Sequence, residues 1–339
     1  MIDPRKIKTL AAWMVVMIVC CNSYAQVPEY TQFYVNPAIV NPGFVGMESF
    51  LDFKFGFKQR WQDFDDGNDM FYLTAFGSIG NTPPSAYKKN SLRVSNPIAY
   101  DQLSRNKNVK RKHGVGGTLT SQSSGPFETI ETGLNYAYHL PVGYKFSLSL
   151  GMSVDMIQNT MDFTNYVVRN QNDDFYQQLV SAQNGDQNLL KIDFGSVFYS
   201  DKLYIGLSSN ALFLEQMSGD EFGEFTTSRS YDLMAGLIED ISPMLEVFPV
   251  VRLSQHDLYG LSWDAIVRLR YRQMVYLGVG YFNDVKTSLL LGLTLNGKFN
   301  LNYSYDYYVS GLNEFNSGSH EVIIGIALFN KHLLENRIW

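Results

Sequence analysis

The chain has 339 residues, of which 45% are apolar, 14% aromatic and 18% charged, and its formal net charge is -6. It is too hydrophobic and aromatic to be disordered, and its acidic balance argues against nucleic acid as a partner. A polytopic helical membrane protein needs repeated apolar runs of about 20 residues, whereas this chain carries one such run, at its N-terminus.

Residues 1–25 are predicted to be a cleaved signal peptide. A basic start precedes an apolar core at 10–21, and small residues precede the cut after Ala25. Cys20 and Cys21 fall inside this segment, so no disulfide is expected in the mature chain. A lipoprotein that uses Cys20 is the alternative interpretation.

The following segment, 26–49, contains two Asn-Pro pairs, Asn36-Pro37 and Asn41-Pro42. Proline biases the residue before it away from the helical conformation, and asparagine side chains bond nearby backbone groups in turns. We therefore expect a rigid periplasmic N-terminal segment that leads into, or plugs, the domain that follows. Direct contact with a cargo or partner protein is the alternative.

Residues 50–329 show the period-two alternation of β-strands. In 143–156, large apolar residues from Tyr144 to Met156 alternate with small or charged ones. This run is longer than the usual strand of about 5–6 residues, and its two faces suit lipid outside and a polar lumen inside. The same alternation predicts strands at 50–58, 71–80, 114–121, 127–140, 143–157, 191–199, 202–210, 229–240, 244–255, 259–272, 274–283, 287–296, 298–309 and 319–329.

These 14 segments predict an all-β fold, a transmembrane antiparallel outer-membrane β-barrel with an even number of strands. A large soluble β-sandwich or lipocalin-like barrel is the alternative. With the N-terminus in the periplasm, the short turns fall on the periplasmic side and the long connections 158–190, 211–228 and 310–318 fall outside. The exception is 81–113, a long connection that the same parity places in the periplasm. Residues 330–339 form a C-terminal tail beyond the last predicted strand.

The connection at 81–113 is strongly basic. Eight basic residues against Asp101 give it a local charge of +7: Lys88, Lys89, Arg93, Arg105, Lys107, Lys110, Arg111 and Lys112. One interpretation is a solvated loop, and the other is a binding site for an acidic periplasmic partner. We take these residues, with the two Asn-Pro pairs, as the candidate partner-binding set.

No motif predicts catalysis, a cofactor or a metal site. The five histidines lack paired metal-ligand spacing. Ser254 and His256 lie close in sequence and leave a lipid-modifying enzyme as a remote hypothesis. Arg268, Arg270 and Arg272 are predicted to point into the lumen, where they would pair with inward acids or line an anion pathway. A channel for small solutes is therefore the alternative function.

Several motifs along the chain resemble those of the PorP/SprF family, outer-membrane proteins of the type IX secretion system and gliding machinery in Bacteroidetes. The double Asn-Pro element is the most specific of them. The matching segments are 32–37, 41–46, 58–61 with Phe64, 113–117, 125–126, 136–140, 193–195, 303–306 and 318–321. The tail at 330–339 and the basic insert around 104–112 depart from the family pattern.

This resemblance implies a non-enzymatic role in the Gram-negative outer membrane. It implies support for export or surface anchoring of cargo proteins that carry a type IX C-terminal domain, such as adhesins. The implied partners are that domain or a surface adhesin, the periplasmic ring or peptidoglycan-linked components, and outer-membrane lipid and lipopolysaccharide.

Overall fold

The computed structural model describes residues 30–48, 50–61, 68–79, 111–142, 146–162, 187–218, 229–257, 260–283, 285–295, 298–309 and 317–329. Two short 3-10 helices come first, η1 (Pro37–Ile39) and η2 (Pro42–Phe44). The strands are β1 (Leu51–Arg60), β2 (Asn68–Ile79), β3 (Lys112–Ser124), β4 (Phe127–Val142), β5 (Phe146–Met161), β6 (Gln187–Tyr199), β7 (Leu203–Ser218), β8 (Ser230–Leu237), β9 (Glu239–Ser242), β10 (Leu245–His256), β11 (Gly260–Tyr271), β12 (Val275–Phe282), β13 (Lys286–Leu295), β14 (Phe299–Tyr308) and β15 (Ser319–Leu328). In these parts of the chain, no helix has the length and apolar character needed to cross a membrane.

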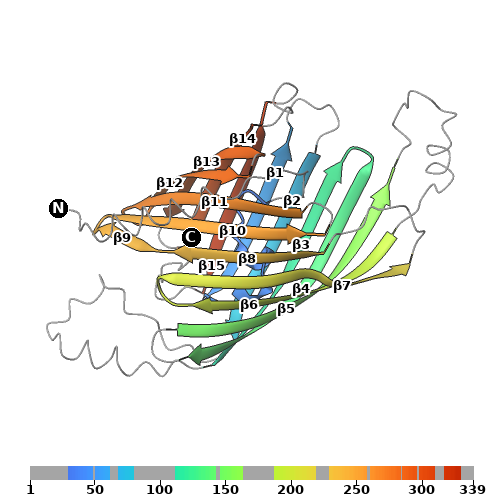
Figure 1. The fold of residues 1–339 in the computed structure, drawn as a ribbon, viewed down its shortest axis with the longest axis horizontal. Coiled ribbons are helices and arrows are strands. Elements are labelled where there is room, and N and C mark those ends of the chain that lie inside the picture. The colour runs from blue at the N-terminus through green and yellow to red at the C-terminus, as the bar shows by residue number, and fades with distance from the viewer. Residues whose placement is uncertain are drawn as a thin grey trace.

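The strands form one closed antiparallel barrel (Figure 1). Sequence neighbours pair with each other, β15 pairs with β1, and the pairing of β10 with β11 completes the ring. β8 and β9 both pair with β10 and are separated only at Ile238, so together they fill one position. The barrel therefore has 14 strand positions, as the alternation predicted.

Each predicted strand is present, but several are longer than predicted. The strand expected at 202–210 extends to Ser218 as β7. Its alternation is interrupted at Ala211, which has a φ of 53°. The Ala211 backbone N–H donates to Asp193 Oδ1 at 2.6 Å, opposite a register shift in β6. Residues 210–212 lie opposite the single residue Asp193, which breaks the alternation locally, so the sequence pattern ends where the strand does not.

The connections give the barrel its orientation. At the end where β1 begins and β15 finishes, most strands are joined by short connections, such as those at 200–202, 243–244 and 272–274. The opposite end carries long connections between β5 and β6 and between β7 and β8, whereas the long connection between β2 and β3 falls at the first end, as the parity of the predicted strands required. Because outer-membrane barrels have short periplasmic turns and longer external loops, we call the first end periplasmic and the second extracellular.

The outer wall is apolar. Large apolar side chains are exposed on the outward faces of every part of the ring, for example Leu134, Met156, Leu207, Leu277 and Leu289. A closed ring leaves its backbone groups paired, and an apolar outer face is then stable in hydrocarbon. The protein is an outer-membrane β-barrel.

The lumen departs from the predicted purely polar lining. Inward residues include charged groups, but also Met70, Tyr72, Met234, Ile266 and Ile323, all fully buried. These apolar side chains face a segment of the chain that fills the lumen, and burial against it is what makes them stable there.

Candidate functional site: a plug inside the barrel

Residues 30–48, which we call the plug, run lengthwise through the lumen. At one end, the ring of Tyr30 packs edge-on against Tyr72, whose strand begins nearby at the extracellular end. At the other, Lys112 at the periplasmic start of β3 donates a hydrogen bond to Met47 O. We expected a periplasmic lead-in or a plug at the barrel mouth. The structure instead places this segment within the barrel, with its earlier residues in the extracellular half.

The two Asn-Pro pairs begin the two short helices. Pro37 opens η1 and Pro42 opens η2, where a missing backbone N–H is harmless. Asn41 is extended and its Oδ1 accepts from Gly43 N at 2.8 Å, the local side-chain cap that the sequence predicted. The Asn36 side chain instead donates to Thr74 Oγ1 on β2 at 2.8 Å. One pair thus shapes the plug internally and the other joins it to the wall.

Asn41 also binds the wall, on strands other than that of Thr74. Its Nδ2 donates to Ser196 O at 3.3 Å and to Leu207 O at 3.1 Å. The neighbouring carbonyl of Val40 accepts from Ser208 Oγ at 3.1 Å. These contacts attach the start of η2 to β6 and β7 through backbone as well as side-chain groups.

His139 on β4 holds the periplasmic part of the plug. Its Nε2 lies 2.8 Å from Val45 O, and a carbonyl only accepts, so Nε2 carries the proton. Its Nδ1 lies 2.9 Å from the Tyr199 hydroxyl, within hydrogen-bond distance. This imidazole therefore links the plug backbone to two strands of the wall.

A buried charged cluster holds the extracellular part of the plug; it consists of Lys58, Lys286, Asp306 and Glu321. Thr31 Oγ1 donates to Asp306 Oδ2 at 2.5 Å and accepts from both lysine Nζ atoms at 2.7 Å. The Thr31 backbone N–H donates to Glu321 Oε2 at 3.0 Å. Lys286 Nζ pairs with Asp306 Oδ2 at 3.0 Å. With two charges of each sign, the cluster is formally neutral.

The same cluster extends to a second plug residue and to β2. Gln32 donates from its backbone N–H to Glu321 Oε2 at 3.2 Å and from its Nε2 to Glu321 O at 3.1 Å. The Tyr72 hydroxyl donates to Glu321 Oε1 at 2.8 Å. Glu321 is 1% exposed, so its negative charge needs stabilisation by these donors and by the lysines.

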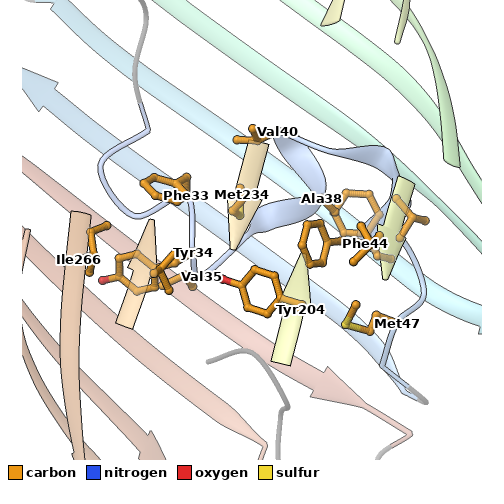
Figure 2. Close-up of a cluster of buried hydrophobic side chains, with 14 of the residues drawn as sticks. Phe33, Tyr34, Val35, Ala38, Val40, Phe44, Met47, Tyr204, Met234 and Ile266 are labelled. Atoms are coloured by element: carbon orange, nitrogen blue, oxygen red, sulfur yellow. The ribbon is translucent and has the colours of Figure 1, made fainter. Parts of the chain in front are cut away.

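Between its two ends the plug is held by apolar packing. Figure 2 shows plug side chains meeting Tyr204, Met234 and Ile266 of the wall. The buried apolar residues of the plug are Phe33, Tyr34, Val35, Ala38, Val40, Phe44, Val45 and Met47. Burying a side chain of this size contributes about 1.5–3 kcal/mol, so this packing is a large share of what keeps the plug in place.

Two wall arginines stack on plug aromatic rings. The guanidinium of Arg268 lies 4.0 Å from the ring centre of Tyr34, and that of Arg252 lies 4.5 Å from the ring centre of Phe33. Burial raises the pKa of the Tyr34 hydroxyl well above its usual value, so the ring stays neutral. Such contacts favour the docked plug by attraction between a cation and an aromatic face.

Glycines bring the periplasmic part of the plug into direct contact with the wall backbone. A Cβ on Gly114 would lie 1.9 Å from Val45 O, and one on Gly151 would lie 2.3 Å from Pro42 O. A Cβ on Gly195 would lie 2.0 Å from Asn41 Oδ1. These distances leave no room for a side chain, so only glycine allows the two backbones to approach so closely.

The predicted partner-binding residues fall in three groups. Asn36, Pro37, Asn41 and Pro42 are buried in the lumen as parts of the plug. Lys112 is also buried and serves the plug, whereas its neighbour Arg111 is exposed. The remaining members, Lys88, Lys89, Arg93, Arg105, Lys107 and Lys110, lie outside the described residues, as do the predicted signal peptide and the tail at 330–339.

The predicted arginine ladder is only partly formed. Arg270 pairs with Glu246, whereas Arg268 stacks on the plug. Arg272 lies in the turn after β11 with a φ of 50° and is exposed, because β11 ends before it. Among the inward acids, Asp264 pairs with Arg252 and not with the ladder, at 2.7 Å. The alternation correctly predicted which residues of β11 face the lumen, but it does not show where the strand ends and the turn begins.

Ser254 and His256 do meet, with Oγ 2.9 Å from Nε2. They share the inward face of β10, and Ser254 is buried. The pair therefore faces the lumen and not the lipid-facing wall.

The charged cluster was not identified from the sequence as a site. Lys58, Asp306 and Glu321 lie in motifs that carried the family resemblance, but no role was assigned to them. One signal for it exists: charges of opposite sign occupy inward positions near the extracellular ends of β1, β13, β14 and β15. In a barrel these strands are neighbours, so the charges converge.

Comparisons with solved structures give outer-membrane protein Omp33 of Acinetobacter baumannii at 8% identity and a TM-score of 0.45, covering 84% of this chain and 100% of that one. The translocator domain of the autotransporter NalP from Neisseria meningitidis matches at 11% identity with a TM-score of 0.43, and the match covers 88% of this chain and 95% of that one. The Pseudomonas putida toluene transporter TodX matches at 9% identity with a TM-score of 0.46, and the match covers 90% of this chain and 94% of that one. Among curated proteins, none matches the chain.

One protein family matches over nearly the whole chain. Its model, described as type IX secretion system membrane protein PorP/SprF, aligns with residues 22–326. The aligned region includes the plug and the strands up to the last one. This chain belongs to the PorP/SprF family of type IX secretion system membrane proteins.

Proposed function

We propose that this barrel supports the export or surface anchoring of type IX cargo proteins, including adhesins of the gliding machinery, through protein–protein contacts rather than by conducting solute. Its family supports a place in the type IX system. The cargo C-terminal domain and the periplasmic ring or peptidoglycan-linked components are the proposed partners. The signal peptide at 1–25 is the proposed route of the chain to the outer membrane.

The observation that carries this proposal is the docked plug. A conducting barrel needs a lumen through which solute passes, whereas here residues 30–48 run through it and bind the wall at both ends. The family's most specific motif, the double Asn-Pro element, is used entirely in this docking. The surfaces left for function are therefore the two ends and the outer wall.

The basic connection between β2 and β3 is the proposed periplasmic contact. β2 finishes at Ile79 and β3 begins at Lys112, both at the periplasmic end. Lys112 is excluded from this role because it donates to Met47 O inside the barrel. The proposed contact therefore consists of Lys88, Lys89, Arg93, Arg105, Lys107, Lys110 and Arg111, with an acidic partner.

The test is deletion of the gene, followed by mass spectrometry of the cell-surface and medium fractions. Proteins with type IX C-terminal domains should leave the surface and return when the wild-type gene is restored. Restoring instead a variant with serine at the seven basic positions, Lys112 being kept, should fold but fail to recover periplasmic partners in a pull-down. An unchanged secreted set in the deletion strain would overturn the proposal.

The alternative function, a small-solute channel, requires the plug to leave its contacts. Planar-bilayer recordings of the wild-type barrel distinguish the two. We expect no steady conductance from a docked plug, and a steady open channel in the wild-type protein would favour the alternative.

A further inference from the structure

The outer wall has a large hollow where a barrel is normally convex. Its volume is about 950 Å³, and it crosses the strands from β4 to β11. Most of its lining consists of outward-facing apolar side chains: Tyr136, Tyr138, Leu150, Met152, Phe194, Leu207, Leu233, Leu253 and Leu261. The hollow therefore opens to the membrane and not to the lumen.

The plug lies directly behind the floor of this hollow. Gly151, Gly195 and Ser196 belong to the lining, and the same residues touch the Asn41–Gly43 element from the inside. At these two glycines, as at Gly114, no side chain separates the wall from the plug, so the two backbones meet. Here the contact lies directly behind the hollow, and the plug backbone therefore supports its floor.

The chemistry of the hollow changes along its length. Its middle is formed by hydrocarbon and thioether side chains, including Met152 and Leu207. Tyr136 and Tyr138 on β4 bring hydroxyl groups to one end of the hollow. Toward the extracellular end, Tyr231 and Gln255 lie opposite each other on β8 and β10. The carboxylate of Asp232 faces the lumen, where it accepts from Asn210 Nδ2 at 2.8 Å. An apolar trough with hydroxyl and amide groups at its outer end suits a lipid chain and its linkage to a head group.

We propose that the hollow is a fixed binding site for an acyl chain of outer-membrane lipid, and that the Asn41-Pro42-Gly43 element shapes it from inside the barrel. The hollow is continuous with the lipid-facing wall, and hydrocarbon is the medium that surrounds it. This goes beyond the secretion role, because it assigns a ligand and a binding surface that do not depend on any cargo.

The first test fills the hollow. The full-length barrel is reconstituted in nanodiscs of phosphatidylethanolamine and phosphatidylglycerol, then moved to detergent, and retained lipid is counted by native mass spectrometry. The wild-type barrel should retain at least one lipid, and Leu207→Trp should lower the retained amount by at least half. The matched control is Leu289→Trp, on the lipid-facing side of β13 and outside the hollow, which should retain as much as wild type.

The second test removes the support from inside. Asn41→Ala loses both bonds to the wall and should also lower lipid retention, whereas Asn36→Ala, which loses only its bond to Thr74, should not. If Asn41→Ala does not fold, the Leu207→Trp comparison still decides. No retained lipid in the wild type, equal retention in Leu207→Trp and Leu289→Trp, or a second protein cross-linked into the hollow would each overturn the proposal.

Discussion

The two ends of the plug are held by different physics. In the extracellular half, Thr31 and Gln32 are bound by side chains of the charged cluster, through hydrogen bonds and buried ion pairs. In the periplasmic half, Val45 and Pro42 lie backbone against backbone on Gly114 and Gly151. One end therefore depends on charge balance, and the other on glycine contacts together with the hydrogen bonds of His139 and Lys112.

This difference determines how the docking of each end responds to substitution. A buried ion cluster tolerates a substitution that keeps its charges balanced. An unbalanced substitution leaves an unpaired charge buried away from water. A glycine contact has no such compensation, because backbone atoms have no alternative rotamers. We expect substitutions at the glycines to prevent docking, and substitutions in the charged cluster to weaken it.

The largest effect is expected from Gly114→Val. Its Cβ would fall 1.9 Å from Val45 O, and the opposing atoms are backbone on both sides. We expect a cost above about 5 kcal/mol, beyond ordinary overpacking. Urea unfolding and heat-modifiability on gels measure it. Gly117→Ala on the same strand is the control, since its nearest atom is 3.4 Å away, and it should fold like wild type. An equal loss of stability in the two variants would show that β3 needs these glycines for strand pairing and not for contact with the plug.

The second-largest loss of stability is expected from Asp306→Asn. It leaves two buried lysines facing Glu321 alone, and breaking a buried pair typically costs about 3–5 kcal/mol. We expect lower stability in urea and, because Thr31 loses its bond to a carboxylate, intermittent conductance in planar bilayers.

Its control removes a complete pair. Lys286→Met combined with Asp306→Leu keeps the remaining Lys58 and Glu321 balanced, and should lose less stability than Asp306→Asn alone. A larger loss in the double variant would mean that hydrogen bonding to Thr31, and not charge balance, holds this end.

A smaller effect is expected from Asn36→Ala. It removes the bond to Thr74 Oγ1 inside the lumen, which is worth about 1 kcal/mol, with up to about 3 kcal/mol if Thr74 is left unsatisfied. The measurement is the urea midpoint, with Thr74→Val and the double variant completing a cycle. Additive losses would show that the two side chains do not act through their mutual bond.

The smallest effect is that of Lys202→Ala at the periplasmic rim. Lys202 pairs with Asp240 at 3.1 Å, but both side chains are about half exposed, so solvent screens the pair. We expect about 0–1 kcal/mol, falling further in high salt. A loss as large as that of Asp306→Asn would mean that stability does not follow burial in this barrel.

Local sequence patterns predicted much of the wall. Each of the 14 predicted strands was found, because alternation with a period of two is a property of neighbouring residues and needs no knowledge of the fold. Strand ends were less accurate. β7 continues beyond Asn210 through a bulge at Ala211, and the bulge is fixed by Asp193 on another strand.

The candidate site was only partly predictable. The Asn-Pro pairs indicated turns, and the Asn41 cap confirms that local interpretation. The contacts of the plug with the wall were not predictable, because Thr31 and Asp306 are 275 positions apart and meet only once the barrel closes. The burial of Lys112 was missed for the same reason, since sequence grouped it with the basic residues before it.

By itself, the sequence determined a membrane-spanning barrel with 14 strands and a turn-rich N-terminal segment, since alternation and proline turns are local features. The tertiary structure decided that this segment fills the lumen and that the charges of four strands converge on it. It also decided that the plug meets the wall at Gly151 and Gly195, behind the hollow of the outer wall. These features come from contacts between distant residues, whose geometry exists only after the ring has closed.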